Sequence, residues 1–235
     1  MGRIFDLDSP VMNFLNKMAD LIGLNLLAAI CCIPIFTIGA SMTALHYVAL
    51  KIVRNEEGYI VKGFFKSFKE NFKQATIIWL ILLAVMFILL GDLIIFIYSG
   101  INFPSWLKIV LLVAAILIVF ATMHVFPLLS RFENSVKNTY KNSLLMGVLA
   151  FPKTILMMVC WVIPVAIAIF MPQLMPVVFC FGISGPAVLC AMLYNGTFKR
   201  FEPQEEEEAD EWFIEEEESQ EGAETDAMQE NDDIE

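Results

Sequence analysis

Residues 75–98 decide the fold, and they read ATIIWLILLAVMFILLGDLIIFIY. Asp92 is the single charged residue in this segment, and leucine, isoleucine and phenylalanine dominate the rest. A bilayer core about 30 Å thick needs roughly 20 apolar helical residues to be crossed. The segment therefore predicts a transmembrane helix.

The next apolar run, residues 106–129, is separated from the first by residues 99–105 alone. Two spans joined by so short a connection must run in opposite directions, because the chain has no length with which to return across the bilayer. The two runs therefore predict an antiparallel hairpin.

The stretch between Lys153 and Lys199 carries no charge and is long enough for two more spans. Pro172 and Pro176 lie near its middle, and neither has the amide hydrogen that a continuous helix needs. We expect a second hairpin that turns at these prolines.

The run from Leu21 to Leu50 contains no Lys, Arg, Asp or Glu. It is too long for one straight span and too short for two with a turn. We expect one crossing over 21–39, perturbed at Pro34; the alternative is a broken or re-entrant helix. The predicted fold is an all-α polytopic bundle with interfacial amphipathic helices and about five spans: 21–39, 75–98, 106–129, 154–170 and 174–194.

Charge divides the chain into two predicted domains. Apolar residues make up 58% of the chain and the net charge is -11, but 18 of the 26 acidic residues fall within 202–235. The remaining 1–201 hold 15 basic and 8 acidic residues, a net of +7. This pattern excludes a soluble enzyme, a disulfide-rich secreted module and a nucleic-acid binder. We expect a membrane-embedded domain over 1–201 and an acidic, disordered cytoplasmic tail over 202–235.

The tail has two acidic blocks around Trp212, Phe213 and Ile214. It is interpreted as a solvating segment, with two alternatives: a short linear motif that folds on a basic surface, or a contact with the lysine-rich loop 51–74.

Orientation follows from the Lys and Arg residues of the loops 51–74 and 130–153, because short cytoplasmic loops hold these residues in excess. We expect both loops inside and both hairpin turns outside. With five spans, a cytoplasmic C-terminus places the N-terminus outside.

A basic amphipathic helix is predicted in the loop 51–74. At 100° per residue the phenylalanines gather on one side and the lysines on another. We interpret this helix as an anchor at the inner interface, its phenylalanines among acyl chains and its lysines toward anionic membrane lipids. The alternative is a docking helix for a partner. The candidate docking residues are Lys62, Phe64, Phe65, Lys66, Phe68, Lys69, Phe72 and Lys73.

Asp92 is a candidate intramembrane polar site. An ionisable group in a span is costly and usually faces the bundle interior or water. The alternative is a snorkelling or protonated carboxyl group bonded to a neighbouring helix. Small residues and prolines in the first and fifth spans serve either close helix packing or broken helices that expose carbonyls to a cavity. The candidate broken-helix positions are Pro34, Gly39, Gly182, Gly185 and Pro186.

Catalytic chemistry has no motif in this sequence. The five cysteines lie in apolar runs without metal-site spacing, and we interpret them as packing residues. His46 and His124 have no clustered carboxylates and are interpreted as satisfied interfacial residues. We expect no enzyme activity, no metal and no cofactor.

Several short motifs resemble the YesL family of bacterial integral membrane proteins. They are FDLDSP at 5–10, LNLL at 24–27, PIFTIGAS at 34–41, TAL at 43–45 and FFKSFKENFKQAT at 64–76. The resemblance covers roughly residues 1–80, and the acidic tail lies outside the family pattern.

The resemblance implies a multi-pass protein of a Gram-positive plasma membrane, often encoded beside carbohydrate ABC-transporter components and two-component regulators. We therefore expect an accessory component of carbohydrate uptake or sensing, with transporter permeases or a sensor kinase as partners. The alternatives are a small transporter or channel, and a membrane-organising structural protein.

Overall fold

The computed structural model describes residues 10–56, 59–98 and 104–201. The chain divides into two compact units, Met1–Asn195 and Gly196–Glu235, and the description below concerns the first. The predicted tail, 202–235, lies outside the described residues.

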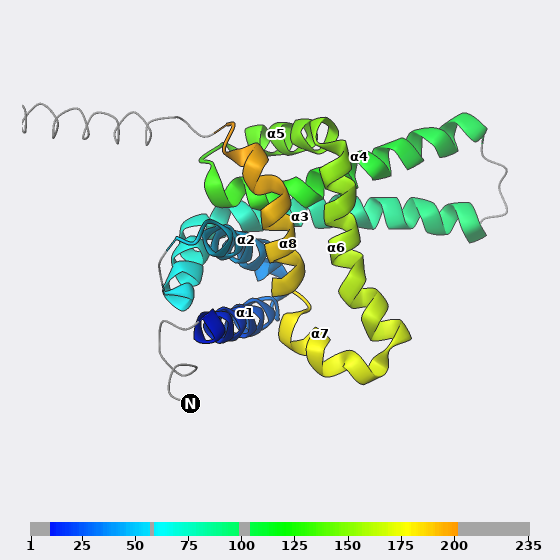
Figure 1. The fold of residues 1–235 in the computed structure, drawn as a ribbon. Helices are drawn as coiled ribbons and strands as arrows, with labels where there is room; N and C mark the ends of the chain where they lie inside the picture. Colours follow the sequence, from blue (N-terminus) through cyan, green and yellow to red (C-terminus); the bar gives the residue numbers. More distant parts are fainter. Residues whose placement is uncertain (1–9, 57–58, 99–103, 202–235) are drawn as a thin grey trace, which may run out of the picture. The chain divides into compact units, whose positions relative to one another are not determined.

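The described residues are helical and contain no β-strand, which confirms the predicted all-α fold (Figure 1). The elements in chain order are α1 (Pro10–Cys31), the 3-10 helix η1 (Ile35–Thr37), α2 (Ile38–Arg54), α3 (Ile60–Tyr98), α4 (Ser105–Arg131), α5 (Val136–Leu149), α6 (Phe151–Phe170), the 3-10 helix η2 (Pro172–Leu174), α7 (Met175–Phe181) and α8 (Ser184–Phe198).

The described part of the chain has four helical segments that are long and apolar enough to cross a membrane. A fifth is counted if the pair Pro172–Phe181 and Ser184–Phe198, bent by 59°, is one span. This supports a membrane-embedded protein. The four segments are Ile35–Arg54, Ile60–Tyr98, Ser105–Arg131 and Phe151–Phe170.

The first apolar run is a broken helix. The crossing expected over 21–39 does not form as one helix, because α1 ends at Cys31 and α2 begins at Ile38. Pro34 is extended, with φ −75° and ψ 123°, and has no amide hydrogen to continue the helix. The Thr37 hydroxyl donates to the carbonyls of Cys31 at 2.6 Å and Pro34 at 2.7 Å, which satisfies acceptors that the break leaves open.

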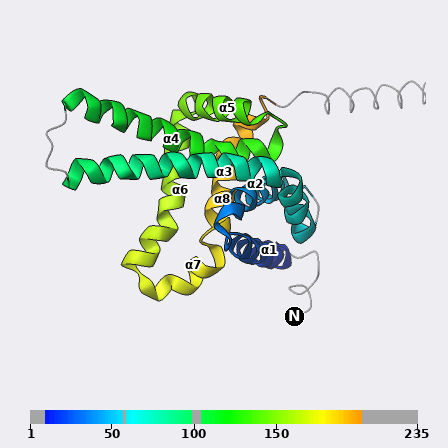
Figure 2. The same cartoon turned by 180° about the vertical axis from the view of Figure 1, so that it is seen from behind.

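Helix α3 is continuous over 39 residues. The sequence predicts an amphipathic loop helix separate from a span that starts at Ala75, but the structure joins them in one continuous helix that bends near its start (Figure 2). No proline interrupts α3, and its two glycines, Gly63 and Gly91, lie near its ends. At 1.5 Å per residue the helix is about 58 Å long.

The core lies where α2 and the middle of α3 meet the C-terminal part of α4. A Cβ atom built on Gly39 would lie 2.5 Å from the Ala75 carbonyl oxygen and 2.6 Å from Trp79 Cβ. Gly39 therefore lets α2 approach α3 closely, and it is the second residue of α2, directly after the break. The main buried cluster consists of Ala40, Ala75, Ile78, Leu82, Val125, Phe126 and Leu129.

Helix α5 is tied to this core by side-chain hydrogen bonds. The Tyr140 hydroxyl donates to the Ile78 carbonyl at 2.6 Å, and the Gln74 amide donates to the Asn134 carbonyl at 2.5 Å. Ser135 caps the start of α5 by accepting from the Asn138 amide. Burial raises the pKa of the Tyr140 phenol to about 12.

Candidate functional site

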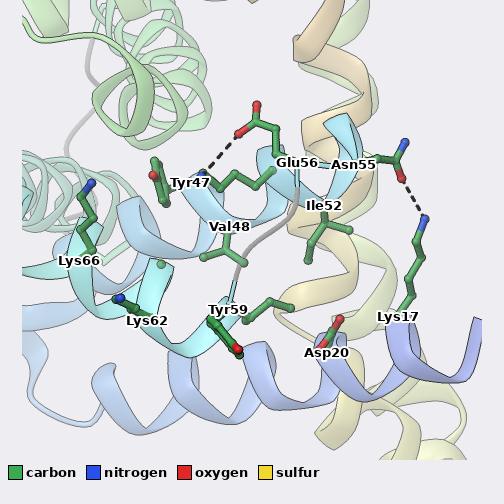
Figure 3. Close-up of a pocket in the computed structure, with 13 residues that line it drawn as sticks. Lys17, Asp20, Tyr47, Val48, Ile52, Asn55, Glu56, Tyr59, Lys62 and Lys66 are labelled. Atoms are coloured by element: carbon green, nitrogen blue, oxygen red, sulfur yellow. Dashed lines mark hydrogen bonds and ion pairs between the residues drawn. The ribbon is translucent and has the colours of Figure 1, made fainter. Parts of the chain in front are cut away.

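A cleft of about 650 Å³ opens between α1, the end of α2 and the start of α3 (Figure 3). A space of this size is within the range of about 300–1,000 Å³ that is usual for ligand sites. Its lining combines tyrosines, aliphatic side chains and charged groups from three helices. The lining residues are Lys17, Asp20, Tyr47, Val48, Lys51, Ile52, Asn55, Glu56, Tyr59, Ile60, Lys62, Gly63 and Lys66.

The backbone at the end of α2 shapes one wall of the cleft. Asn55 is left-handed, with φ 54° and ψ 28°, a conformation that asparagine tolerates better than most residues. Its amide donates to the Ile52 carbonyl, and the Glu56 amide donates to the Lys51 carbonyl at 3.0 Å. This turn ends α2 and brings the side chains of Asn55 and Glu56 to the cleft.

The cleft is cationic, because four lysines and two acids line it. Glu56 lies 3.6 Å from Lys51, whose ammonium group also lies 5.3 Å from the centre of the Tyr47 ring. Lys62 and Lys66 are exposed and form no ion pair or hydrogen bond within the described residues. The α3 side of the cleft therefore carries two uncompensated positive charges.

A hydrogen bond across the cleft joins the N-terminal segment to the end of α2. Lys17 Nζ donates to Asn55 Oδ1 at 3.0 Å. The sequence predicts the N-terminal segment outside and the loop that contains Asn55 inside, whereas two groups in contact lie on one side of a bilayer. The break between α1 and α2 explains the difference, because it lets the first apolar run turn back. Which side the two groups share stays a prediction.

Most phenylalanines of the predicted amphipathic helix pack on other parts of the protein. Phe64 is fully buried and stacks with Phe68 at a centroid distance of 6.1 Å. Phe68 and Phe72 are half-buried, lie 5.5 Å apart and pack against the core cluster. Phe65 is 48% exposed. Phe64 therefore cannot insert among acyl chains as expected, because the core has already taken that face of α3.

The lysine face remains free. All four lysines of the predicted docking surface are exposed. Lys62 and Lys66 line the cleft, whereas Lys69 and Lys73 lie on later turns of α3 and are not among its lining residues. The lysines of the predicted docking surface thus form two pairs, one inside the cleft and one outside it.

Asp92 lies far from the cleft. It is half-buried near the C-terminal end of α3, about 9 Å before the helix ends at Tyr98. No hydrogen bond or ion pair joins it to another residue in the described ranges 10–56, 59–98 and 104–201. Along α3 it is about 39 Å from Lys66. The two candidate sites therefore occupy opposite ends of one helix.

The buried side-chain amide of Asn25 forms hydrogen bonds at the break between α7 and α8, and the sequence does not predict them. We call this set of hydrogen bonds the Asn25 latch. Asn25 of α1 donates from Nδ2 to the Phe179 carbonyl at 2.7 Å. Its Oδ1 accepts from the amides of Ile183 at 2.8 Å and Ser184 at 3.0 Å. Asn25 therefore satisfies three backbone groups that the bend leaves without helical partners. The signal available was a lone amide within an apolar run.

The predicted broken-helix positions of the fifth span differ in role. Gly182 lies in the bend, where an added Cβ would collide with the Val178 carbonyl oxygen. Gly185 and Pro186 lie in the first turn of α8, where a proline does not interrupt helical hydrogen bonding. Ser184 is fully buried, and its hydroxyl has no hydrogen-bond partner among the residues that the structure describes.

The two histidines are buried inside the protein. The Tyr194 hydroxyl lies 3.3 Å from His46 Nδ1 and donates to the His46 carbonyl at 3.4 Å. His124 Nδ1 lies 3.3 Å from the Phe120 carbonyl oxygen. Among the described residues no group of three or more His, Cys, Asp or Glu side chains could hold a metal ion.

Comparison with known proteins gives one match. The family described as a protein of unknown function, DUF624, matches residues 21–93, which run from α1 through most of α3. The matched range contains Asn25, Asp92 and most of the cleft. No curated protein and no solved structure matches the chain. The chain is therefore similar over 21–93 to a family without an assigned function, and the resemblance to the YesL family stays a prediction.

Proposed function

We propose that this chain is a bacterial plasma-membrane accessory protein that holds a partner complex of carbohydrate uptake or sensing, without enzymatic activity of its own. The observation that carries the proposal is the continuity of α3. One helix joins an exposed basic face at one end to an apolar hairpin at the other.

The length of α3 supports this arrangement. Measured along its axis, α3 is about 58 Å long, which exceeds a bilayer core of about 30 Å by nearly half its length. The apolar residues from Ala75 onward take the membrane-spanning part, so the lysines near the start of α3 project beyond it. Short cytoplasmic segments are rich in Lys and Arg, which favours the cytoplasmic side for this end. Because Lys17 donates a hydrogen bond to Asn55, the N-terminal part of α1 then lies on the same side of the membrane.

The outer parts of α3 and α4 provide the membrane contact surface. Their apolar side chains are mostly exposed, and Asp92 has no partner among the described residues. A carboxylate within a span is stabilised by a cationic or hydrogen-bond-donating group on a neighbouring helix. The partner expected here is a membrane protein whose helix carries such a group.

The carbohydrate role rests on the YesL resemblance, which implies transporter permeases or a sensor kinase as partners. The match to DUF624 is compatible with it and adds no function. Deletion of the gene in its host, followed by growth and uptake on a panel of oligosaccharides, tests this step. A role in carbohydrate uptake or sensing predicts a defect on particular sugars; unchanged growth and uptake on all of them would contradict it.

The docking step is tested by affinity capture of the full chain in mild detergent. Wild-type protein is expected to recover permease subunits or a sensor kinase, and Asp92→Asn to reduce the recovery about tenfold through the lost charge. Gly91→Ala is the matched control, because an added Cβ there meets nothing within 4 Å. Repeated recovery of the chain alone, or equal recovery with Asp92→Asn, would contradict the proposal.

The Asn25 latch favours a second candidate function, a small transporter. It joins α1, which ends at one helix break, to the break between α7 and α8, where the buried Ser184 hydroxyl has no partner within the described part of the chain. Discontinuous helices form the substrate sites of several transporter folds. Purified protein in liposomes is then expected to carry sugar or proton flux that Ser184→Ala alters. Absence of flux from the wild-type protein would remove this candidate.

A further inference from the structure

We propose that the cationic cleft between α1, α2 and α3 binds a phosphate ester that also carries free hydroxyl groups. This inference concerns the cleft alone and does not depend on a partner complex or on carbohydrate transport. Neither the lysine-face prediction nor the match to DUF624 assigns this site.

The positive charges of the cleft come from three helices. Lys17 comes from α1, Lys51 from α2, and Lys62 and Lys66 from α3, so three separate helices bring cations to one space (Figure 3). Like charges around a cavity repel one another at partly reduced dielectric. A bound anion removes this repulsion, and a lysine ammonium group is a common partner of phosphate.

Two of the four lysines of the cleft already have partners. Lys51 is engaged with Glu56, and Lys17 with Asn55. Lys62 and Lys66 lie one helical turn apart on the same side of the cleft, without partners within the described residues. They form the anion-binding pair, while Lys17 and Lys51 supply positive potential from the facing helices.

The third step is the presence of hydroxyl-binding groups. Asp20 has no ion pair within the described residues and lines the cleft from α1. Asn55 uses its carbonyl oxygen for Lys17 and keeps its two amide hydrogens for a ligand. A carboxylate accepts hydrogen bonds but repels a bare anion, so Asp20 selects a ligand with hydroxyl donors as well as a phosphate.

The fourth step is the apolar and aromatic lining. Val48, Ile52 and Ile60 form an aliphatic part of the wall, and Tyr47 and Tyr59 add two phenol rings. Rings of this kind cover the carbon face of a polyol while their hydroxyls stay in contact with water. The ligand class is therefore a polyol phosphate, either the head group of a glycerophospholipid or a soluble glycerol or sugar phosphate.

The experiment uses the full-length protein in nanodiscs and separates the two sources. In discs of neutral phosphatidylcholine, glycerol phosphate and inorganic phosphate are titrated and the heat of binding is measured. In a parallel series, native mass spectrometry compares the retention of phosphatidylglycerol with that of phosphatidylcholine. Binding in the first series alone indicates a soluble ligand, and retention in the second alone indicates a lipid; each outcome supports the site. Absence of both overturns the proposal.

Two double variants of equal charge locate the binding. Lys62→Gln with Lys66→Gln is expected to weaken binding on the order of tenfold, because it removes both free cations of the cleft. Lys69→Gln with Lys73→Gln removes the same charge from the same helix outside the cleft and is expected to change affinity less than about twofold. Equal losses in the two variants would show attraction to a general basic surface and overturn the proposal.

Asp20→Asn tests the hydroxyl requirement. It is expected to lower affinity for glycerol phosphate or phosphatidylglycerol relative to inorganic phosphate or phosphatidic acid, which lack the free polyol hydroxyls. An unchanged ratio would overturn the polyol part of the inference. All these side chains are exposed, so the variants should fold, and thermal unfolding of each variant without ligand serves as the folding check.

Discussion

Helix α2 and the C-terminal half of α3 are both apolar enough to cross a membrane, yet they differ in how far the protein buries them. In the span that contains α2, 61% of the apolar window is buried inside the protein, against 6% in the window of α3. The buried helix is rich in glycine, alanine, serine and threonine, whereas the exposed one is rich in leucine, isoleucine and phenylalanine. Apolarity thus predicts membrane residence, but residue size predicts which helices pack on protein.

The physical reason is that lipid tails are as apolar as leucine, so burial in protein gains little from the hydrophobic effect inside a bilayer. Close contact and satisfied polar groups must hold the buried helix. Accordingly, the Ser41 hydroxyl donates to the Ala28 carbonyl at 3.0 Å, and Gly39 lies against the backbone of α3.

The largest expected effect is the difference between a buried and an exposed isoleucine of α3. Ile78 is 0% exposed and Ile94 is 57% exposed on the same helix. Ile78→Ala is expected to lower the free energy of unfolding by about 3 kcal/mol, because it leaves a cavity in the core. Ile94→Ala should change it by less than about 0.5 kcal/mol. Unfolding of each variant in detergent measures the difference, and equal losses would mean that the C-terminal half of α3 is also packed on protein.

The next effect sharpens the role of small residues. Gly39→Ala is expected to cost about 2–3 kcal/mol of unfolding free energy, since the new Cβ lies 2.5 Å from a backbone oxygen that cannot move alone. Gly91→Ala in the exposed part of α3 should stabilise by about 0.5 kcal/mol, because alanine favours the helix and nothing lies within 4 Å. If both variants had the same sign, close packing of α2 on α3 would not be the reason for Gly39.

Local pattern was enough to predict the all-α fold and membrane-embedded character. The free lysine face of α3 also agrees with its periodicity. Local pattern could not show which apolar side chains meet protein instead of lipid, because both environments favour the same residues. Phe64 illustrates this limit, since its predicted lipid face is the face that the core covers.

The cleft and the latch depend on contacts between distant parts of the chain. Lys17 meets Asn55 across 38 residues, and Asn25 meets Ser184 across 159. Neither pairing leaves a periodic signal, and the break between α1 and α2 had to be known before Lys17 could be placed. Lys62 and Lys66 were predicted as a face, but not as one wall of a cavity.

The latch yields the third prediction. Asn25→Ala is expected to lower the free energy of unfolding by about 2 kcal/mol, because it leaves the amides of Ile183 and Ser184 buried without acceptors. Asn16→Ala, on the exposed face of the same helix, should have an effect below about 0.5 kcal/mol. Hydrogen exchange at residues 179–184 adds a local readout that is expected to rise in Asn25→Ala alone. Unchanged exchange would show that α1 does not hold the bend.

The smallest effect concerns the bond that ties α5 to α3. Tyr140→Phe removes the hydroxyl that donates to the Ile78 carbonyl at 2.6 Å and is expected to cost about 1 kcal/mol. Burial raises the pKa of this phenol to about 12, above its ordinary value of about 10. The folded protein therefore favours the protonated phenol, so its contribution is complete below pH about 10 and is lost as pH rises through about 12. Unfolding free energies measured from pH 8 to 12 should fall less steeply for Tyr140→Phe than for the wild type. Parallel curves would contradict the buried bond, because a solvent-exposed phenol titrates alike in the folded and unfolded states.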